Sequence, residues 1–414
     1  MRFNTKEMYL LLFRLLQKVS KIDLHSLQVA YMSKSMGMEL GFSKHRMNVI
    51  GFLHDIGLLN PVQVNQVQRI HGVENASMRN WLALDSGLQE NHAVIGSRIV
   101  SKIKDIAELS EVVEKHHYYS MLLDPSNEQD VMANVIHLAD TVSISLISGE
   151  RTVKHIDEVK QNIANSSEFL EEARDAFEKI SEKKGFWWSV VDEDTLYNEF
   201  EQDLEENTLS NNDLQSLGDI LMYMTDVKSK FTTFHTERIA YLSRLLARRA
   251  HLGDERSMEV FFAAKIHDLG KMATPISILE KPGKLTEEET FIMQRHIFDS
   301  FLIVGGREAI EKHRLLQWGI NHHERLDGSG YPWGRSGAEL DLESRIIMLA
   351  DVFVALTEDR PYRKGMSVES SLDIIARQVQ SGLLDEYVFV KLRDLVAEGL
   401  DFSGIEHTKN PFLL

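Results

Sequence analysis

The chain has 414 residues, of which 43% are apolar, so it is long enough to bury two hydrophobic cores. It contains no cysteine, which excludes disulfide frameworks and thiolate metal sites and agrees with a reducing cytoplasm. Its formal net charge of −17 argues against a broad surface for binding duplex nucleic acid. No apolar run approaches the roughly 18 residues that span a bilayer, so we expect a cytoplasmic protein without membrane attachment.

The first predicted element is an amphipathic helix around Met8–Phe13, because Arg14 and Lys18 interrupt the apolar run and no small-residue cleavage site follows. Further along the chain, apolar residues recur at three- and four-residue spacing, as in Ile239–Leu246 and Ile346–Leu356. The chain has seven prolines, and sustained alternation of β-branched residues is hard to find. The sequence therefore predicts an all-α protein with little or no sheet.

An acidic, weakly apolar stretch lies near the middle of the chain, from about Asp157 to Asn212. Its composition is typical of exposed helices and a connector. We therefore expect a domain boundary near Asn207–Asp213, which gives an amino-terminal domain of residues 1–207 and a carboxy-terminal domain of residues 208–414.

Potential metal ligands form a series that occurs twice, in the same order along the chain. Ten of the 17 histidines belong to the two series, so chance placement explains them poorly. The first series is His25, His54, Asp55, His92, His116, His117 and Asp140, and the second is His235, His267, Asp268, His296, His322, His323 and Asp351. A duplicated helical domain is the simplest explanation.

The adjacent His267 and Asp268 lie in the apolar helical sequence AAKIHDLGK, where burying both groups without partners would lose hydration energy. Taken alone, such a doublet is more often a hydrogen-bonded core pair than a metal site. The whole second series, however, supplies five imidazoles and two carboxylates, which is more than one tetrahedral ion can use. The full set suits two octahedral ions with open positions for water and substrate, an arrangement that hydrolyses phosphodiesters.

Longer motifs surround the second series, namely FHTERI, HDLGK, ILEKPGKL, HHERLDGSGYP and RIIMLADVFVALTEDRPYR. Over about residues 220–370 they resemble, in order and content, the HD-GYP subgroup of the HD superfamily of metal-dependent phosphohydrolases. The resemblance implies an all-helical fold and hydrolysis of a bacterial cyclic dinucleotide, either 3′3′-cGAMP or cyclic di-GMP, to a linear dinucleotide. It also implies two divalent transition-metal ions. Iron or manganese is the family expectation, and the same ligands would accept zinc or nickel.

Carried over residue by residue, the resemblance implies that one ion is held by His235, His267 and Asp351 and the other by His296, His322 and His323. Asp268 would bridge the two ions. Lys271 would direct its ammonium group at a phosphate oxygen or at the leaving oxygen. Arg360 and Arg363 would contact substrate phosphate or base, with an ordinary surface salt bridge as an equal alternative for each.

The loop HHERLDGSGYP is expected to turn sharply at the mouth of this site, because Gly328 and Gly330 allow unusual backbone angles and Pro332 stiffens the exit. In the family this loop also contacts partners, including diguanylate cyclase domains. A purely architectural turn is an equally good interpretation. A homodimer is a further expectation for the whole protein.

Two residues depart from the family pattern around the site. Phe231 stands where members with a third metal have a glutamate, which favours a binuclear site. Val354 replaces an aspartate that would pair with the catalytic lysine, so Lys271 is expected to be freer or differently held. A signalling module that binds a cyclic dinucleotide or a protein without turnover is therefore the alternative function. The GYP and RPYR elements count against a third possibility, an HD nucleotidase or dNTP hydrolase.

The amino-terminal half resembles a degenerate HD domain, which makes the protein a tandem of two HD-type helical domains. Leu58 occupies the position of the lysine, and HHYYSMLLD replaces the HHER and GYP elements. We expect a regulatory, sensory or dimerisation module whose histidines are satisfied by hydrogen bonds, with metal binding by the first series as the alternative. The tandem arrangement is similar to that of 3′3′-cGAMP phosphodiesterases, which favours that substrate over cyclic di-GMP.

Overall fold

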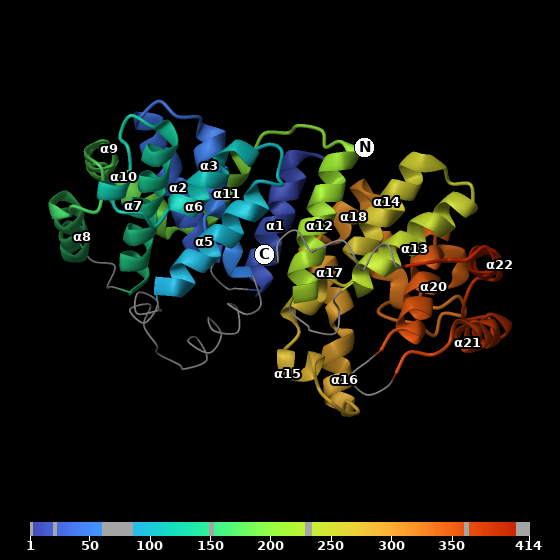
Figure 1. Ribbon diagram of the computed structural model, residues 1–414. Coiled ribbons are helices and arrows are strands. Elements are labelled where there is room, and N and C mark those ends of the chain that lie inside the picture. Colours follow the sequence, from blue (N-terminus) through green and yellow to red (C-terminus); the bar gives the residue numbers. More distant parts are fainter. Residues whose placement is uncertain are drawn as a thin grey trace. The chain divides into compact units, whose positions relative to one another are not determined.

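The computed structural model describes residues 3–19, 23–59, 86–148, 153–227, 234–359 and 364–402 (Figure 1). These residues form α-helices joined by short 3₁₀ helices and loops, and their extended pairings are limited to two isolated bridges. The prediction of an all-α protein is confirmed. Within the same ranges, none of the helices has the length and apolar character that a membrane span requires.

The chain divides into two compact units. The amino-terminal unit, Asn4–Thr208, contains α1 (Thr5–Val19), α2 (Asp23–Glu39), α3 (Lys44–Leu53), η1 (Ile56–Leu59), α5 (Ser86–Val100), η3 (Ala107–Leu109), α6 (Ser110–Lys115), η4 (Ser120–Leu122), α7 (Glu128–Ser148), α8 (Val153–Asn165), α9 (Glu171–Ser181), α10 (Lys184–Val191) and α11 (Glu193–Gln202). Its central helix is α2, which packs against α3, α7, α9 and α11.

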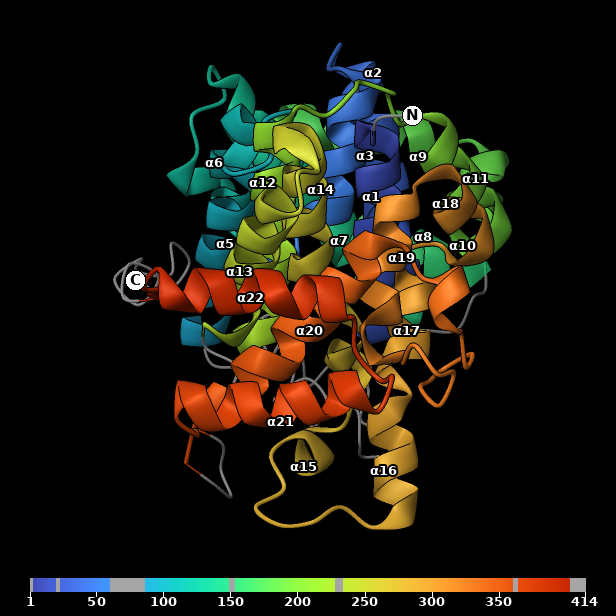
Figure 2. The ribbon, with the colours of Figure 1, turned by 90° about the vertical axis from the view of Figure 1, so that its right-hand side faces the viewer.

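The carboxy-terminal unit begins at Leu209 and includes Phe3. It contains α12 (Asn211–Val227), α13 (His235–Arg249), α14 (Gly253–Lys265), η5 (Leu269–Ala273), α15 (Ile276–Leu279), α16 (Glu287–Gln294), α17 (His296–Ile303), α18 (Gly306–Lys312), α19 (Arg314–Ile320), η6 (Asn321–His323), η7 (Gly337–Glu339), α20 (Leu342–Thr357), α21 (Val368–Gln380) and α22 (Glu386–Ala397). Figure 2 shows α21 and α22 beside α20, and α20 packs against both.

The core of the carboxy-terminal unit is formed by α13, α14 and α20. The helix α13 buries Ile239, Leu242 and Leu246, which recur at three- and four-residue spacing and form one apolar face. The helix α20 buries apolar residues on several sides, among them Ile346 and Phe353, as expected of a helix inside the core. Both helices lie where the apolar periodicity predicted them.

The segment predicted as exposed helices and a connector belongs instead to the core of the amino-terminal unit. Residues 157–202 form most of α8 and all of α9, α10 and α11, and their buried side chains include Phe177, Trp187 and Phe200. The ring of Phe200 lies 4.6 Å from that of Phe52 in α3. The prediction was wrong because these helices are amphipathic. The composition averaged over both faces of a helix is acidic and weakly apolar, even though one face carries an apolar stripe.

Removing the Phe200 side chain tests this correction. Phe200→Ala is expected to destabilise the protein by about 3–5 kcal/mol, since it leaves a cavity beside Phe52 in a closely packed core. The shift of the urea unfolding midpoint measures the effect. Asn198→Ala, on the exposed face of the same helix, is the control and should change stability by less than about 0.5 kcal/mol. Equal effects of the two substitutions would contradict the packing described.

Candidate metal centre

The doublet His267 and Asp268 lies just beyond the end of α14, not inside a helix as the apolar sequence suggested. The chain then tightens into the 3₁₀ helix η5, which packs against α17. At Gly270 the two elements approach so closely that a Cβ atom would collide with the carbonyl oxygen of His296 and with the amide nitrogen of Ser300. Only glycine allows this approach, and it brings Asp268 next to His296.

All seven members of the second series gather at one place in the carboxy-terminal unit. The ligand atoms of His296, His322 and His323 lie within 4.8 Å of one another, and so do those of His235, His267 and Asp268. Asp268 belongs to the second group and also faces the first, with Oδ2 3.1 Å from His267 Nε2 and Oδ1 3.2 Å from His296 Nε2. Asp351, on α20, completes the cluster, with Oδ1 3.7 Å from His235 Nε2.

Three of the imidazole rings are oriented by their own helices. The Nδ1 atoms of His267, His296 and His322 each lie 2.6 Å from a carbonyl oxygen three residues earlier in the chain. A carbonyl can only accept a hydrogen bond, so each Nδ1 carries a proton and, in the neutral ring, Nε2 presents a lone pair to the cluster. These lone pairs converge on a carboxylate, which itself only accepts.

This arrangement leaves buried acceptors without donors. His267 Nε2, His296 Nε2 and Asp268 Oδ1 are buried and have no hydrogen-bond partner among the described residues. Unsatisfied buried polar atoms cost about 1–3 kcal/mol each, so a set of three is hard to maintain unless something compensates. A divalent transition-metal ion accepts lone pairs from imidazole and carboxylate together. The residues present therefore fit a metal centre.

The electrostatics of the cluster also favour a bound cation. Burial opposes the charged form of Asp268, yet His267 and Lys271 outweigh it and hold the pKa of this carboxyl well below its usual value. Burial lowers the pKa of His267 as well, but Asp268 and Asp351 reverse the effect and raise it. Burial lowers the pKa of His322 to about 3, so this ring stays neutral. The cluster thus combines two carboxylates with a neutral ligand, and a positive charge is stabilised among them.

Lys271 is not free. Its ammonium group forms an ion pair and a hydrogen bond with Asp268 Oδ2, and its side chain is 18% exposed. Val354, which stands where the family has an aspartate, is fully buried. The lysine is therefore differently held, by the central carboxylate of the cluster itself. Phe231, Arg360 and Arg363 lie outside the described residues, so the predictions for them stay predictions.

A second carboxylate orients His235 and was missed by the sequence analysis. Glu358, at the end of α20, lies with Oε2 2.6 Å from His235 Nδ1 and accepts a hydrogen bond of 2.9 Å at Oε1 from Arg238. The arrangement fixes His235 so that Nε2 points toward Asp351. The only signal in the sequence is an acidic residue directly after the helix that carries Asp351, and a solvent-exposed residue would look the same.

The loop after the His pair is built around Glu324, also missed by the sequence analysis. Its fully buried carboxylate accepts hydrogen bonds of 3.0 Å and 2.9 Å from the amide groups of Trp333 and Arg335. At Gly330 a Cβ atom would collide with the backbone of Glu324, and Gly328 has a positive φ of 80°. The predicted sharp turn is confirmed. It places the ring of Tyr331 in a stacked position 4.8 Å from that of His323.

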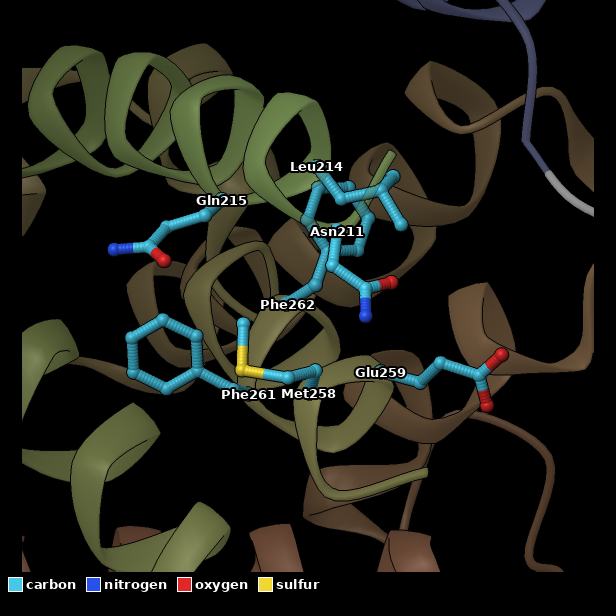
Figure 3. Close-up of a pocket in the computed structure, with 7 residues that line it drawn as sticks. All are labelled: Asn211, Leu214, Gln215, Met258, Glu259, Phe261 and Phe262. Carbon is cyan, nitrogen blue, oxygen red and sulfur yellow. The ribbon is translucent and has the colours of Figure 1, made fainter. Parts of the chain in front are cut away.

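A small pocket elsewhere in the unit does not compete with this cluster as the candidate site. It lies between α12 and α14 and is lined mainly by apolar side chains such as Leu214, Phe261 and Phe262 (Figure 3). The space inside it that admits a water molecule is only about 10 Å³, roughly the room that one water needs and far below the roughly 300–1,000 Å³ of typical small-molecule sites. None of the seven cluster residues lines it.

Gly270→Ala tests the close approach that assembles the cluster. The added methyl group must push η5 away from His296, so we expect this variant to bind much less metal and to unfold at a lower temperature. Metal content after equilibrium dialysis measures the first effect. Gly283→Ala is the matched control, because a Cβ atom there meets nothing within 4 Å. Unchanged metal content in Gly270→Ala would contradict the geometry.

Glu358→Ala tests the support of His235. Loss of such a carboxylate partner typically weakens metal affinity by about 10–100-fold, and Glu358→Gln, which keeps a neutral acceptor, should lose less. Competition with a chromophoric chelator measures both affinities. The control is Asp373→Asn, which changes an exposed carboxylate on α21. The account is wrong if Glu358→Ala binds metal as tightly as this control.

Comparison with known proteins places the chain in a family. Residues 22–144 and residues 219–388 each match a family described as an HD domain. The 3′3′-cGAMP-specific phosphodiesterase 1 of Vibrio cholerae is 30% identical over 409 residues, which cover 93% of this chain and 90% of that protein. The cyclic di-GMP phosphodiesterase response regulator RpfG of Xanthomonas campestris is 39% identical over 151 residues, or 36% of this chain and 39% of that protein.

A crystal structure of a cyclic GMP-AMP-specific phosphodiesterase of Vibrio cholerae has the same fold, with a TM-score of 0.60 and 21% identity over 97% of this chain and 99% of that one. Together with the two HD matches, this likeness confirms the expectation of two HD-type helical domains in tandem. HD-domain phosphodiesterases depend on metal, in agreement with the clusters described. The chain belongs to the HD-GYP family of cyclic dinucleotide phosphodiesterases, as its motifs indicated.

Proposed function

We propose that the carboxy-terminal unit is a metal-dependent phosphodiesterase that opens a cyclic dinucleotide to its linear form. The observation that carries the proposal is the convergence of imidazole Nε2 atoms on Asp268, with two of these nitrogens and one carboxylate oxygen lacking a hydrogen-bond partner among the described residues. A centre of this kind can act on an anionic phosphodiester although the protein as a whole carries a net charge of −17.

Of the cyclic dinucleotides, 3′3′-cGAMP is the preferred candidate and cyclic di-GMP the second. The relative that aligns with 93% of this chain is named as specific for 3′3′-cGAMP. RpfG of Xanthomonas campestris, which is named as a cyclic di-GMP phosphodiesterase, aligns with only 36% of it. The first match covers both units and the second covers little more than a third of the chain. We therefore favour 3′3′-cGAMP over cyclic di-GMP as the substrate.

Two divalent ions would be held by the two ligand groups. His296, His322 and His323 would hold one, His235, His267 and Asp351 would hold the other, and Asp268 would bridge them. Iron or manganese is expected, and zinc or nickel would suit the same ligands. When bound, such ions supply Lewis-acid polarisation of the phosphodiester and activation of water.

The chain's own residues would hold the substrate and offset its charge. Lys271 is anchored on Asp268 at the edge of the cluster and remains partly exposed, so its ammonium group can reach a phosphoryl oxygen. There it would stabilise the negative charge that develops as water adds across one P–O bond and the ring opens. Arg360 and Arg363 are proposed to bind the phosphates or bases of the same substrate.

Three further expectations complete the proposal. The loop built around Glu324 would be the surface that contacts a diguanylate cyclase domain, since it exposes Trp333 beside the site. The protein would work as a homodimer. It would act in the cytoplasm, where a bacterial second messenger is made and degraded.

A substrate panel tests the proposed function. Metal-loaded protein is mixed with 3′3′-cGAMP and with cyclic di-GMP, and the products are resolved by chromatography. We expect a linear dinucleotide from 3′3′-cGAMP at the higher rate. Asp268→Ala should abolish the product in either case. Tight substrate binding by the metal-loaded wild type without any product would instead identify a non-catalytic binding module.

Lys271→Met tests the role of the ammonium group. Loss of one group that stabilises the transition state typically lowers kcat by about 10²–10³-fold, and we expect a fall of that order with little change in metal content. Lys284→Met is the matched control, because it makes the same change at an exposed position of the same unit. A Lys271→Met enzyme that turns over as fast as the control would remove the lysine from the mechanism.

A further inference from the structure

The amino-terminal unit contains a second cluster made from the first series. His25 lies in α2, His54 and Asp55 lie between α3 and η1, and His92 lies in α5. His116 and His117 follow α6, and Asp140 lies in α7. The ligand atoms of Asp55, His92, His116 and His117 lie within 4.8 Å of one another, and so do those of His25, His54 and Asp55. Asp55 belongs to both groups.

The geometry of this cluster closely repeats that of the carboxy-terminal unit. Asp55 Oδ1 lies 3.2 Å from His92 Nε2 and 3.8 Å from His116 Nε2, the same two distances that Asp268 Oδ1 makes with His296 and His322. The rings of His116 and His117 are 3.9 Å apart at 42°, against 4.0 Å and 43° for the pair in the other unit.

The close approach that assembles the cluster is repeated as well. At Gly57 a Cβ atom would collide with the carbonyl oxygen of His92, just as one at Gly270 would collide with that of His296. The glycine is therefore required in both units for the same reason. Seven side chains and the glycine that positions them have kept their arrangement although the lysine next to them has been replaced by Leu58.

Hydrogen bonds to the surrounding backbone orient two of the rings, and inside the cluster His92 Nε2 lies 3.1 Å from His117 Nε2 and 3.5 Å from His116 Nε2. His54 Nδ1 lies 2.8 Å from the carbonyl oxygen of Gly51, and His116 Nδ1 lies 2.6 Å from that of Val113, so both rings hold a proton on the outer nitrogen. His54 Nε2 points inward, is fully buried and has no hydrogen-bond partner among the described residues. The expectation that hydrogen bonds satisfy these histidines fails at His54.

His25 is oriented by a relay of side chains. Its Nδ1 lies 2.8 Å from the hydroxyl oxygen of Ser143, which donates its own proton to Gln28. The amide of Gln28 in turn donates to the carbonyl oxygen of Val190. With that hydroxyl proton committed, His25 Nδ1 must donate, and Nε2 faces Asp140 Oδ1 at 3.3 Å and Asp55 Oδ2 at 3.8 Å. This is the supporting shell that metal-binding histidines usually have.

We propose that the amino-terminal unit holds divalent transition-metal ions of its own, in the two ligand groups that share Asp55, and that this second centre is structural rather than catalytic. The ions would join α2, α5, α7 and the ends of α3 and α6, which are distant in sequence. Such a centre contributes its binding free energy to the stability of the unit.

Two observations argue against a catalytic role for this centre. Leu58, which is buried, stands at the position of Lys271, so that among the described residues Asp55 has ion-pair contacts with histidines alone. The segment after His117 also differs from the loop around Glu324. It turns into η4, where Ser120 donates hydrogen bonds from both its amide and its hydroxyl to the 167–168 backbone. Among the residues that the structure describes, neither an ammonium group nor a glycine-rich loop borders the cluster.

The test uses the full chain with the carboxy-terminal centre disabled by Asp268→Ala and His296→Ala, which leaves the amino-terminal unit unaltered. This double variant is titrated with Co²⁺ and followed by its visible absorption, by metal content after dialysis and by thermal unfolding. We expect tight Co²⁺ binding and a rise in unfolding temperature. A double variant that binds no Co²⁺ and melts at the same temperature with and without it would overturn the proposal.

A matched variant assigns any bound metal to the cluster. Adding Asp55→Ala, which removes the ligand common to both groups, together with His25→Ala and His92→Ala, which removes one further ligand from each, should abolish Co²⁺ binding, and retained binding would place the metal elsewhere and overturn the assignment. The metal-loaded double variant should produce no linear dinucleotide, and product would overturn the structural role. These outcomes do not depend on the proposed function, because wild-type protein that binds metal but hydrolyses nothing would refute only that function.

Discussion

A buried carboxylate surrounded by imidazoles whose protons point outward is the constraint on which the carboxy-terminal unit depends. Asp268 cannot donate, and the nitrogens that face it are acceptors as long as their rings are neutral. The protein fixes this polarity by bonding three Nδ1 atoms to carbonyl groups three residues earlier, at helix ends and in turns. The cluster is therefore arranged for a cation before any ion is bound. The buried nitrogen and oxygen atoms that lack a hydrogen-bond partner among the described residues would gain one interaction each when a metal ion binds.

The packing of the unit serves this arrangement. Only because Gly270 lacks a side chain can η5 lie against the start of α17, and this contact sets Asp268 beside His296. The helices α13 and α20 pack together through apolar faces, and this packing brings His235, Asp351 and Glu358 within hydrogen-bonding or ion-pair reach. Lys271, three residues after Asp268, forms an ion pair with the Asp268 carboxylate. Hydrophobic packing thus sets the distances, and the polar groups determine what the site can bind.

Much of this could be predicted from the sequence, for reasons that can be named. The helices α13 and α20 have strong apolar periodicity, and the ligand series stood out because ten of the 17 histidines fall into two series with the same order. The partners of Lys271 and His235 could not be predicted. Both depend on side chains that meet only after folding, and Glu358 resembles an ordinary surface carboxylate. Residues 157–202 were misjudged because their apolar residues occupy one face of acidic helices and vanish in an average.

The two units illustrate how a metal cluster and a catalytic site can be separated. Both keep the central carboxylate, the His pair and the glycine, whereas only the carboxy-terminal unit has the lysine and the loop anchored on Glu324. The cluster demands a cation for its own stability, and catalysis additionally demands groups that meet the substrate. A duplicated domain can therefore lose the groups that meet the substrate and still require the cation.

The most direct measurement is a crystal structure of the full chain with diffraction recorded at the absorption edge of the bound metal. The account predicts anomalous density on both sides of Asp268, with the imidazoles of His267, His296 and His322 coordinating through Nε2 while Nδ1 stays bonded to the backbone. Metal-replete crystals without density at Asp268, or with these rings coordinating through Nδ1, would contradict it.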